Sequence, residues 1–180
     1  MASHLAARLW ARFKPHLGTV AMALVAWVAV HLWQTRDIPS GPAPALFFTL
    51  LQADGSQTQT TLAQWRDQHP GEPVAIYVWA DWCPICKAMA PNVHQLVKDR
   101  PVLTVAMQSG PPANVAAVLR QRQMPWQTAV DTHGNMARAL GVKAVPAYLV
   151  LDGQGQIRSA SVGYTSELGM RARLGWASLF

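Results

Sequence analysis

The stretch VWADWCPICKAMAP, residues 78–91, contains the only two cysteines of this 180-residue chain, Cys83 and Cys86. A continuous apolar run, Val74–Trp79, leads into it and has the length of a strand buried on both faces of a sheet. A helical pattern follows over residues 83–99. The cysteines therefore lie where a buried strand gives way to a helix. Their spacing fits four roles: a structural disulfide, half of a metal site, a redox couple, or two unrelated buried residues.

The position of Cys83 at the start of a helix favours redox chemistry. As the N-cap residue, its sulfur is expected to accept the backbone N–H groups of Ile85 and Cys86. Pro84 falls at the first helical position, where a missing N–H costs no helical hydrogen bond. The positive end of the helix dipole also favours the thiolate, so we expect the pKa of Cys83 to lie below that of a free cysteine. Cys86, one turn later, faces the core, so Cys83 is expected to attack and Cys86 to resolve.

The other roles are weighed against this one. A structural disulfide across so short a loop removes little entropy from the unfolded chain. A structural zinc site needs four ligands, and the chain has no second cysteine pair. Copper stays open as an alternative, because Cys83 and Cys86 with His94 or His133 could hold Cu(I). A domain that only binds partners also stays open, and it predicts that Cys83→Ser leaves the phenotype intact.

A second apolar segment precedes this region. Residues 17–33 contain no Asp, Glu, Lys or Arg, and a helix over this range rises roughly 25 Å, near the lower limit for crossing a bilayer core. Arg8, Arg12 and Lys14 precede it and Arg36 follows it. This imbalance predicts a cytoplasmic N-terminus and transfer of the rest of the chain across the membrane.

These observations divide the chain into a cytoplasmic N-terminus (1–16), a transmembrane anchor (17–33), a Pro/Gly-rich linker (34–45) and one domain (46–180). Two alternatives for the apolar segment are a cleaved signal peptide, with a loose A-x-A site at residues 43–45, and a buried core helix. Much of the net charge of +6 belongs to the segment around the anchor. The domain has no basic stripe interleaved with aromatic residues, so nucleic-acid binding has no support.

Within the domain, strand and helix patterns alternate and close with a hairpin and a helix. The expected strands are 46–51, 57–61, 74–79, 102–107, 128–130, 148–151 and 156–162, and the expected helices are 62–69, 83–99, 114–122, 135–140 and 167–179. This order predicts an α/β sandwich, with a mixed central sheet and helices on both faces.

A second motif, GVKAVPAYLVLDG at residues 141–153, places a proline at the head of a buried strand. Together with WCPIC and with Pro91 eight residues after the first cysteine, it resembles the thioredoxin superfamily. The resemblance implies a thioredoxin-like fold and a cis Val145–Pro146 bond that faces the dithiol. It also implies that the backbone of Val145 binds an extended substrate segment beside Cys83. The substrate-binding residues would then be Trp82, Pro84, Ile85, Val145 and Pro146.

The stretch 107–131 has room for a helix and a strand that plain thioredoxins lack at this point. With the leading hairpin and the anchor, this insertion is similar to the TlpA/ResA/DsbE branch of membrane-tethered thioredoxin-like proteins. The motif ADWCPIC looks most like the ScsD-type group within that branch. One residue departs from the pattern: Tyr77 stands where thioredoxins commonly have a buried carboxylate. Glu72 and Asp131 are the remaining candidates for proton transfer, and neither is favoured.

The sequence therefore predicts a thiol–disulfide oxidoreductase anchored in the bacterial inner membrane, with its domain in the periplasm. We expect it to reduce protein disulfides, for example in cytochrome c maturation or copper stress. Resemblance implies re-reduction by a DsbD/ScsB-like transmembrane electron donor. No organic cofactor or metal is required, because the Cys83 and Cys86 sulfurs carry the electrons. The alternatives are an oxidase with the same site and a copper-binding protein or chaperone. A peroxidase is disfavoured, since no Thr precedes Cys83 at the spacing that peroxiredoxins use.

Overall fold

The computed structural model describes residues 2–180, and the side chains of residues 18–26 and 28–180. The chain divides into two compact units, one up to Arg36 and one from Asp37 onward. The first is a single helix, α1 (Ala2–Thr35). Its window Gly18–Thr35 has a mean hydropathy of 1.3 and could cross a membrane by length and composition. The basic side chains before this window, on which the predicted orientation depends, lie outside the described ones.

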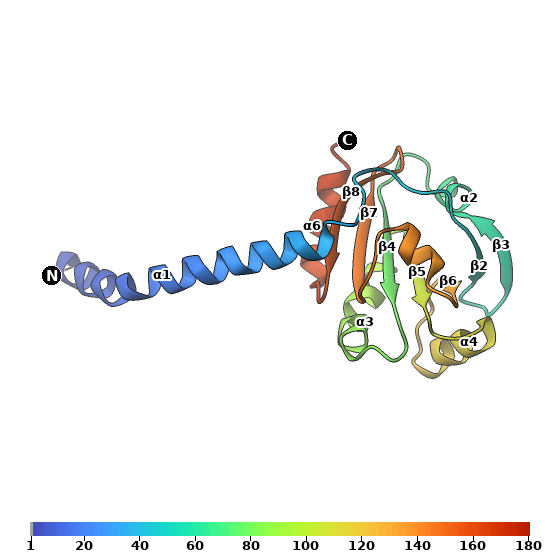
Figure 1. Ribbon diagram of the computed structural model, residues 1–180, viewed down its shortest axis with the longest axis horizontal. Helices are drawn as coiled ribbons and strands as arrows, with labels where there is room; N and C mark the ends of the chain where they lie inside the picture. The colour runs from blue at the N-terminus through green and yellow to red at the C-terminus, as the bar shows by residue number, and fades with distance from the viewer. Residues whose placement is uncertain (1) are drawn as a thin grey trace. The chain divides into compact units, whose positions relative to one another are not determined.

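An eight-stranded mixed sheet forms the centre of the second unit (Figure 1). The strand order is β1-β8-β7-β4-β5-β6-β2-β3. β4, β5 and β6 are parallel, whereas the other neighbouring strands pair antiparallel. The bounds are β1 Gly41–Pro42, β2 Phe47–Leu51, β3 Gln57–Thr61, β4 Val74–Trp79, β5 Val102–Met107, β6 Thr128–Asp131, β7 Ala147–Leu151 and β8 Gln156–Val162.

Helices cover both faces of this sheet, which explains why β4 is apolar throughout. Alternate residues of a strand point to opposite faces. Tyr77 and Trp79 pack in the core under α3, α4 and α6, whereas Ile76 and Val78 pack in the core under α2 and α5. The predicted α/β sandwich with a mixed sheet is confirmed. The helices are α2 Leu62–Arg66, α3 Pro84–Leu96, α4 Pro112–Gln121, α5 Asn135–Ala139 and α6 Glu167–Ala177.

The segment before β2, expected to be a linker, contributes to the sheet. Gly41–Pro42 pair with β8, and the N–H of Ala43 donates to the Gly155 carbonyl at 3.0 Å. An edge strand tolerates proline, because an edge residue has no need of both ladder hydrogen bonds. Further back, the Asp37 carbonyl lies against Gly141, where φ is +73° and an added Cβ would overlap it. Only glycine suits that position, and the compact unit extends back to Asp37.

Candidate active site

Cys83 follows the carboxyl end of β4 and is the N-cap of α3 (Figure 1). Its backbone is extended, and Pro84 occupies the first turn of the helix. The backbone N–H of Cys86 donates to the Cys83 sulfur at 3.1 Å. Among the hydrogen bonds of the described residues, this is the one backbone donor to that sulfur; the expected second donor, Ile85, does not reach it. The N-cap role predicted from the sequence is therefore present with one N–H rather than two.

The two cysteines form a disulfide, with their Cα atoms 5.2 Å apart. Their exposed fractions are 4% for Cys83 and 3% for Cys86, so burial does not distinguish them. Their neighbours do. The Cys83 sulfur lies 3.7 Å from the Val145 carbonyl oxygen, whereas Cys86 packs against the buried ring of Tyr77. The two sulfurs therefore differ in their surroundings.

The Val145–Pro146 peptide bond is cis, as the resemblance implied. It immediately precedes β7, which pairs antiparallel with β4 so that Ala147 lies opposite Val78. The end of β4 and the start of β7 therefore meet at one edge of the sheet. This register brings Val145 to the Cys83 sulfur although 62 positions separate the two residues in the sequence.

The surface around the disulfide is apolar. Trp82 is 55% exposed and Ile85 is 49% exposed, and Pro84 is exposed between the cysteines. The indole N–H of Trp82 donates to the Gln108 carbonyl at 3.2 Å, which fixes the ring beside the helix start. Exposed apolar side chains held in place at one spot are typical of a protein-binding surface. Val145 is half-buried and Pro146 is buried beneath this surface.

Three residues that the sequence analysis did not single out hold the loop before Cys83. The Ser109 hydroxyl accepts the N–H of Asp81 at 3.1 Å, and the Arg122 guanidinium donates to the Asp81 carbonyl at 3.1 Å. Gln108 holds Trp82, as described above. These residues come from the insertion 107–131, between 26 and 41 positions away from their partners. No local pattern signals contacts between segments so far apart in the chain.

Tyr77 occupies the position where a buried carboxylate was considered. Its side chain is fully buried, and its hydroxyl donates to the Cys86 carbonyl at 3.5 Å. Burial raises the pKa of Tyr77 far above its ordinary value, so the phenol stays neutral near neutral pH. It therefore orients the backbone of Cys86 and removes no proton from the thiol.

The two carboxylates considered for proton transfer lie elsewhere. Glu72 is exposed before β4, at the opposite end of the strand from Cys83. Asp131 is buried at the end of β6, and its carboxylate accepts the N–H of Ala137 at 2.9 Å. That bond ties Asp131 to the first turn of α5. The structure gives neither residue a contact with Cys86.

The histidines considered for copper do not gather around the cysteines. Among the side chains of residues 18–26 and 28–180, no group of three or more His, Cys, Asp or Glu is placed to hold a metal ion. His94 lies two turns after Cys86 on α3, and His133 is exposed in the turn before α5.

Comparison with known proteins places the chain in a family. A sequence model of the AhpC/TSA family matches residues 41–160, which include both cysteines and the cis-proline. A "Thioredoxin-like protein" of Haemophilus influenzae is 30% identical over 61% of this chain and 65% of its own length, just under two thirds. The "Thiol:disulfide interchange protein DsbE" of Pseudomonas fluorescens is 29% identical over 89% of this chain and 92% of its own.

The fold comparison agrees with these matches. The crystal structure of a thiol:disulfide interchange protein from Chlorobium tepidum superposes with a TM-score of 0.60 at 20% identity. The match covers 78% of this chain and 97% of the other. The predicted thioredoxin-like fold is thereby confirmed. The chain belongs to the AhpC/TSA family of thioredoxin-like proteins, and within that family it is similar to the DsbE-type thiol:disulfide interchange proteins.

Proposed function

We propose that this protein is a membrane-anchored thiol–disulfide oxidoreductase that reduces disulfides of other proteins in the periplasm, with Cys83 as the nucleophile and Cys86 as the resolving thiol. The observation that carries the proposal is the place of Cys83 at the start of α3. There the backbone nitrogen of Cys86 donates to the Cys83 sulfur over 3.1 Å. An N–H and a helix dipole directed at sulfur favour the thiolate, which is the attacking species. The DsbE relatives support the same class of reaction.

The reaction begins with the reduced pair. The Cys83 thiolate attacks one sulfur of the substrate disulfide, an S–S bond forms between them, and the other substrate sulfur leaves as a thiolate. Cys86 then loses its proton and attacks the Cys83 sulfur. The Cys83–Cys86 disulfide forms, the mixed disulfide breaks, and the first substrate sulfur also leaves as a thiolate. Two electrons have passed to the substrate, and the oxidised pair seen in this structure is the product.

The surroundings of Cys83 suit both steps. The N–H of Cys86 stabilises the negative charge on the Cys83 sulfur when it attacks and again when it leaves, and a thiol of lower pKa leaves faster. The Val145 carbonyl oxygen lies 3.7 Å away, just before β7, and is suited to pair with the backbone of an extended substrate segment. Trp82 and Ile85 supply apolar contacts on the other side.

The cellular setting extends this proposal. The apolar window Gly18–Thr35 supports an uncleaved anchor in the bacterial inner membrane, with the catalytic unit in the periplasm. The motif ADWCPIC supports an ScsD-type assignment. A DsbD/ScsB-like transmembrane dithiol would then reduce the Cys83–Cys86 disulfide after each cycle. Disulfide-bonded proteins of cytochrome c maturation or of copper stress are the proposed substrates.

Trapping of the mixed disulfide tests the mechanism. In Cys86→Ser, the resolving step cannot occur, so substrate proteins should remain linked to Cys83 and be released by dithiothreitol. Cys83→Ser is the matched control, because it keeps one thiol in the same motif. We expect adducts with Cys86→Ser and none with Cys83→Ser. Equal adducts with both variants, or none with either, would contradict the assigned roles.

The direction of electron flow needs a separate measurement. The same residues act as an oxidase if the reduced form is over-stabilised, because this raises the reduction potential. We expect a low potential against glutathione, and a mostly reduced pair when cells are quenched with a thiol-alkylating mass tag. A high potential with a mostly oxidised pair would identify an oxidase.

A further inference from the structure

A cavity of about 520 Å³ lies beside Cys86, and its walls come from α3, β4 and the end of the insertion 107–131. Cys86, Ala90 and His94 line it at intervals of four residues, which places them on one face of α3. Its volume falls in the range of small-molecule sites. The catalytic cycle proposed above gives this space no role.

The wall of the cavity opposite α3 is aromatic and apolar. Met124 and Trp126 come from the segment after α4, and Tyr77 and Trp79 come from β4. The Trp79 and Trp126 rings meet edge to face, with centroids 5.9 Å apart. Such a wall suits the flat, apolar body of a ligand.

Two donors in this wall lack an acceptor. Trp79 and Trp126 are each 2% exposed, and their buried indole N–H groups have no hydrogen-bond partner among the described residues. A buried N–H without an acceptor is unfavourable, so groups of this kind are usually satisfied in proteins. Both rings line the cavity, but their N–H groups lie behind its surface, so the wall that a ligand would meet is the apolar part of the rings.

The charged side chains that line the cavity are both basic. They are those of Lys87 and Arg122, and no Asp or Glu lines it. Lys87 and Arg122 take part in none of the ion pairs of the described residues. The Arg122 guanidinium donates to a neutral backbone carbonyl, that of Asp81, so its charge stays uncompensated. This arrangement favours a negatively charged ligand.

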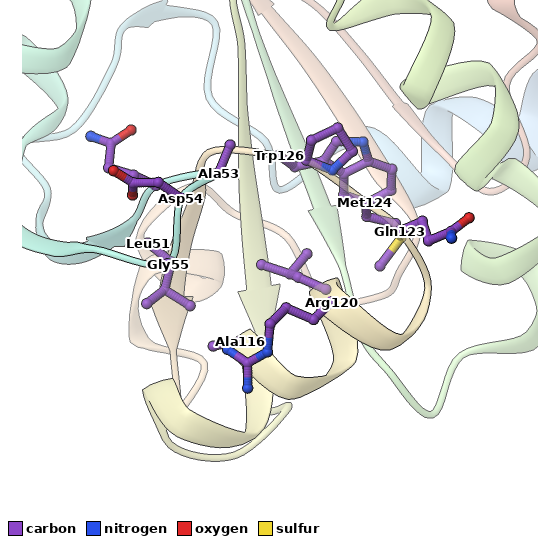
Figure 2. A pocket seen from close by; sticks show the side chains of 12 residues that line it. Leu51, Ala53, Asp54, Gly55, Ala116, Arg120, Gln123, Met124 and Trp126 are labelled. Atoms are coloured by element: carbon purple, nitrogen blue, oxygen red, sulfur yellow. The ribbon is translucent and has the colours of Figure 1, made fainter.

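A second cavity provides a contrast. It measures about 400 Å³ and lies between the β2–β3 turn and α4, on the other side of Met124 and Trp126 (Figure 2). Its lining contains the acidic Asp54 as well as the basic Arg120, so the negative charge offsets the positive one there. Excess positive charge and one member of the redox pair, Cys86, therefore meet at the cavity beside Cys86.

We propose that the cavity beside Cys86 binds a small amphipathic anion, an acid group carried on a planar apolar body. The body would contact Ala90, Met124 and Trp126, and the acid group would lie toward Lys87 and Arg122. The insertion 107–131 thus supplies a ligand site in addition to holding the active-site loop. This inference goes beyond the proposed disulfide reduction and does not depend on it.

Binding of 1-naphthoate to the full-length oxidised protein in zwitterionic detergent tests the proposal. 1-Naphthamide is the matched neutral probe, because it has the same ring without the charge. By titration calorimetry, with the detergent blank subtracted, we expect one naphthoate per chain, weakened by added salt. Naphthamide should bind about two- to fivefold more weakly, the loss expected for a partly exposed charge pair. Equal affinity for both probes, or no saturable binding, would overturn the proposal.

Variants locate the site. Lys87→Gln and Arg122→Gln should each weaken naphthoate binding about two- to fivefold, and Ala90→Trp should abolish it by filling the cavity. Arg120→Gln is the matched control, because it removes the same charge from the neighbouring cavity. Lys87 makes no side-chain hydrogen bond in the described structure, so its variant avoids disturbing the loop that Arg122 holds. A weakening by Arg120→Gln equal to that by Lys87→Gln would refute the assigned site. Since the disulfide stays closed throughout, failure here would leave the proposed reductase activity untouched.

Discussion

Cys83 and Cys86 carry the same thiol chemistry, but the fold gives the two sulfurs different neighbours. A backbone N–H lies 3.1 Å from the Cys83 sulfur, at the positive end of α3. Cys86 lies in the first turn of the same helix, beside the neutral phenol of Tyr77. Hydrogen bonding to the charged form stabilises a thiolate, whereas an apolar neighbourhood disfavours it. The reactivity proposed for Cys83 depends on this N–H and on the helix dipole.

The first prediction concerns the acidity of these thiols. With Cys86→Ser, the remaining Cys83 thiol should have a pKa below that of a free cysteine, because the helix start stabilises its thiolate. With Cys83→Ser, the remaining Cys86 thiol should have a higher pKa than Cys83. The rate of iodoacetamide alkylation as a function of pH measures both. If Cys83 alkylates with the pH profile of a free thiol in solution, the proposed nucleophile is wrong.

At the scale of elements, the insertion 107–131 holds the active-site loop. Ser109 and Arg122 bind both backbone groups of Asp81, and Gln108 binds the indole of Trp82. The loop before Cys83 is therefore fixed by the segment that follows β5, the strand that pairs with β4. The same segment also forms one wall of the cavity beside Cys86. The insertion 107–131 thus holds the loop before Cys83 and also forms one wall of the cavity beside Cys86.

The turn between β7 and β8 is closed by one carboxylate. Asp152 is fully buried and accepts the N–H groups of Gln154 and Gln156 at 2.9 and 2.8 Å, and it pairs with Arg158. Burial acts to raise the pKa of Asp152, but these bonds outweigh it and hold the pKa below its ordinary value of 3.8. The pKa of Asp152 is lower in the folded state than in the unfolded state. Its contribution to the free energy of unfolding is therefore fully present above the unfolded-state pKa. It is lost as the pH falls toward the folded-state pKa.

The second prediction follows from this turn. Asp152→Asn should lower the free energy of unfolding by about 1.5–3 kcal/mol at pH 7, the range for hydrogen bonds to a charged group. It should also flatten the loss of stability below about pH 4. Urea unfolding of both proteins from pH 7 to pH 2 measures this. Asp54→Asn is the control: Asp54 closes the β2–β3 turn through Ser56 but is exposed, so its effect should be much smaller. Parallel pH profiles for wild type and Asp152→Asn would contradict the assignment.

For the whole molecule, the key question is whether α1 stays attached to the domain. Gly41–Pro42 form an edge strand on β8, and Asp37 packs against Gly141. Asp37 also pairs with Lys143 at 2.8 Å. Cleavage after Ala45 would remove the edge strand and these contacts, so the proposed uncleaved anchor predicts that they are retained.

The third prediction tests this attachment. We expect the protein in the membrane fraction to resist carbonate extraction and to have the mass of the complete chain. Ala45→Leu is the control, because it blocks the A-x-A site and leaves an exposed position otherwise intact. Its mass should differ from that of the wild type by the substitution alone. A wild-type protein shorter by the first 45 residues, with Ala45→Leu at full length, would establish a cleaved signal peptide.

Local signals account for what could be predicted from the sequence. The strands Val74–Trp79 and Val102–Met107 were predicted with the bounds that the structure gives, because an apolar run between turn residues is a local pattern. The N-cap position of Cys83 was predicted from its order with Pro84 and the helix. Helix ends were less accurate: α3 stops at Leu96 rather than at residue 99, since the last turn of a helix is poorly defined by pattern alone.

The sequence by itself determined the redox pair, the helix that carries it, the apolar N-terminal segment and, through the family resemblance, the cis-proline. Only the tertiary structure decided which groups surround the sulfurs. The register of β4 against β7 brings Val145 to Cys83, and the insertion brings Ser109 and Arg122 to Asp81. The physical reason is the distance along the sequence over which each signal acts. Periodicity and capping act over a few residues, whereas these contacts depend on strand order and side-chain packing across the whole sheet.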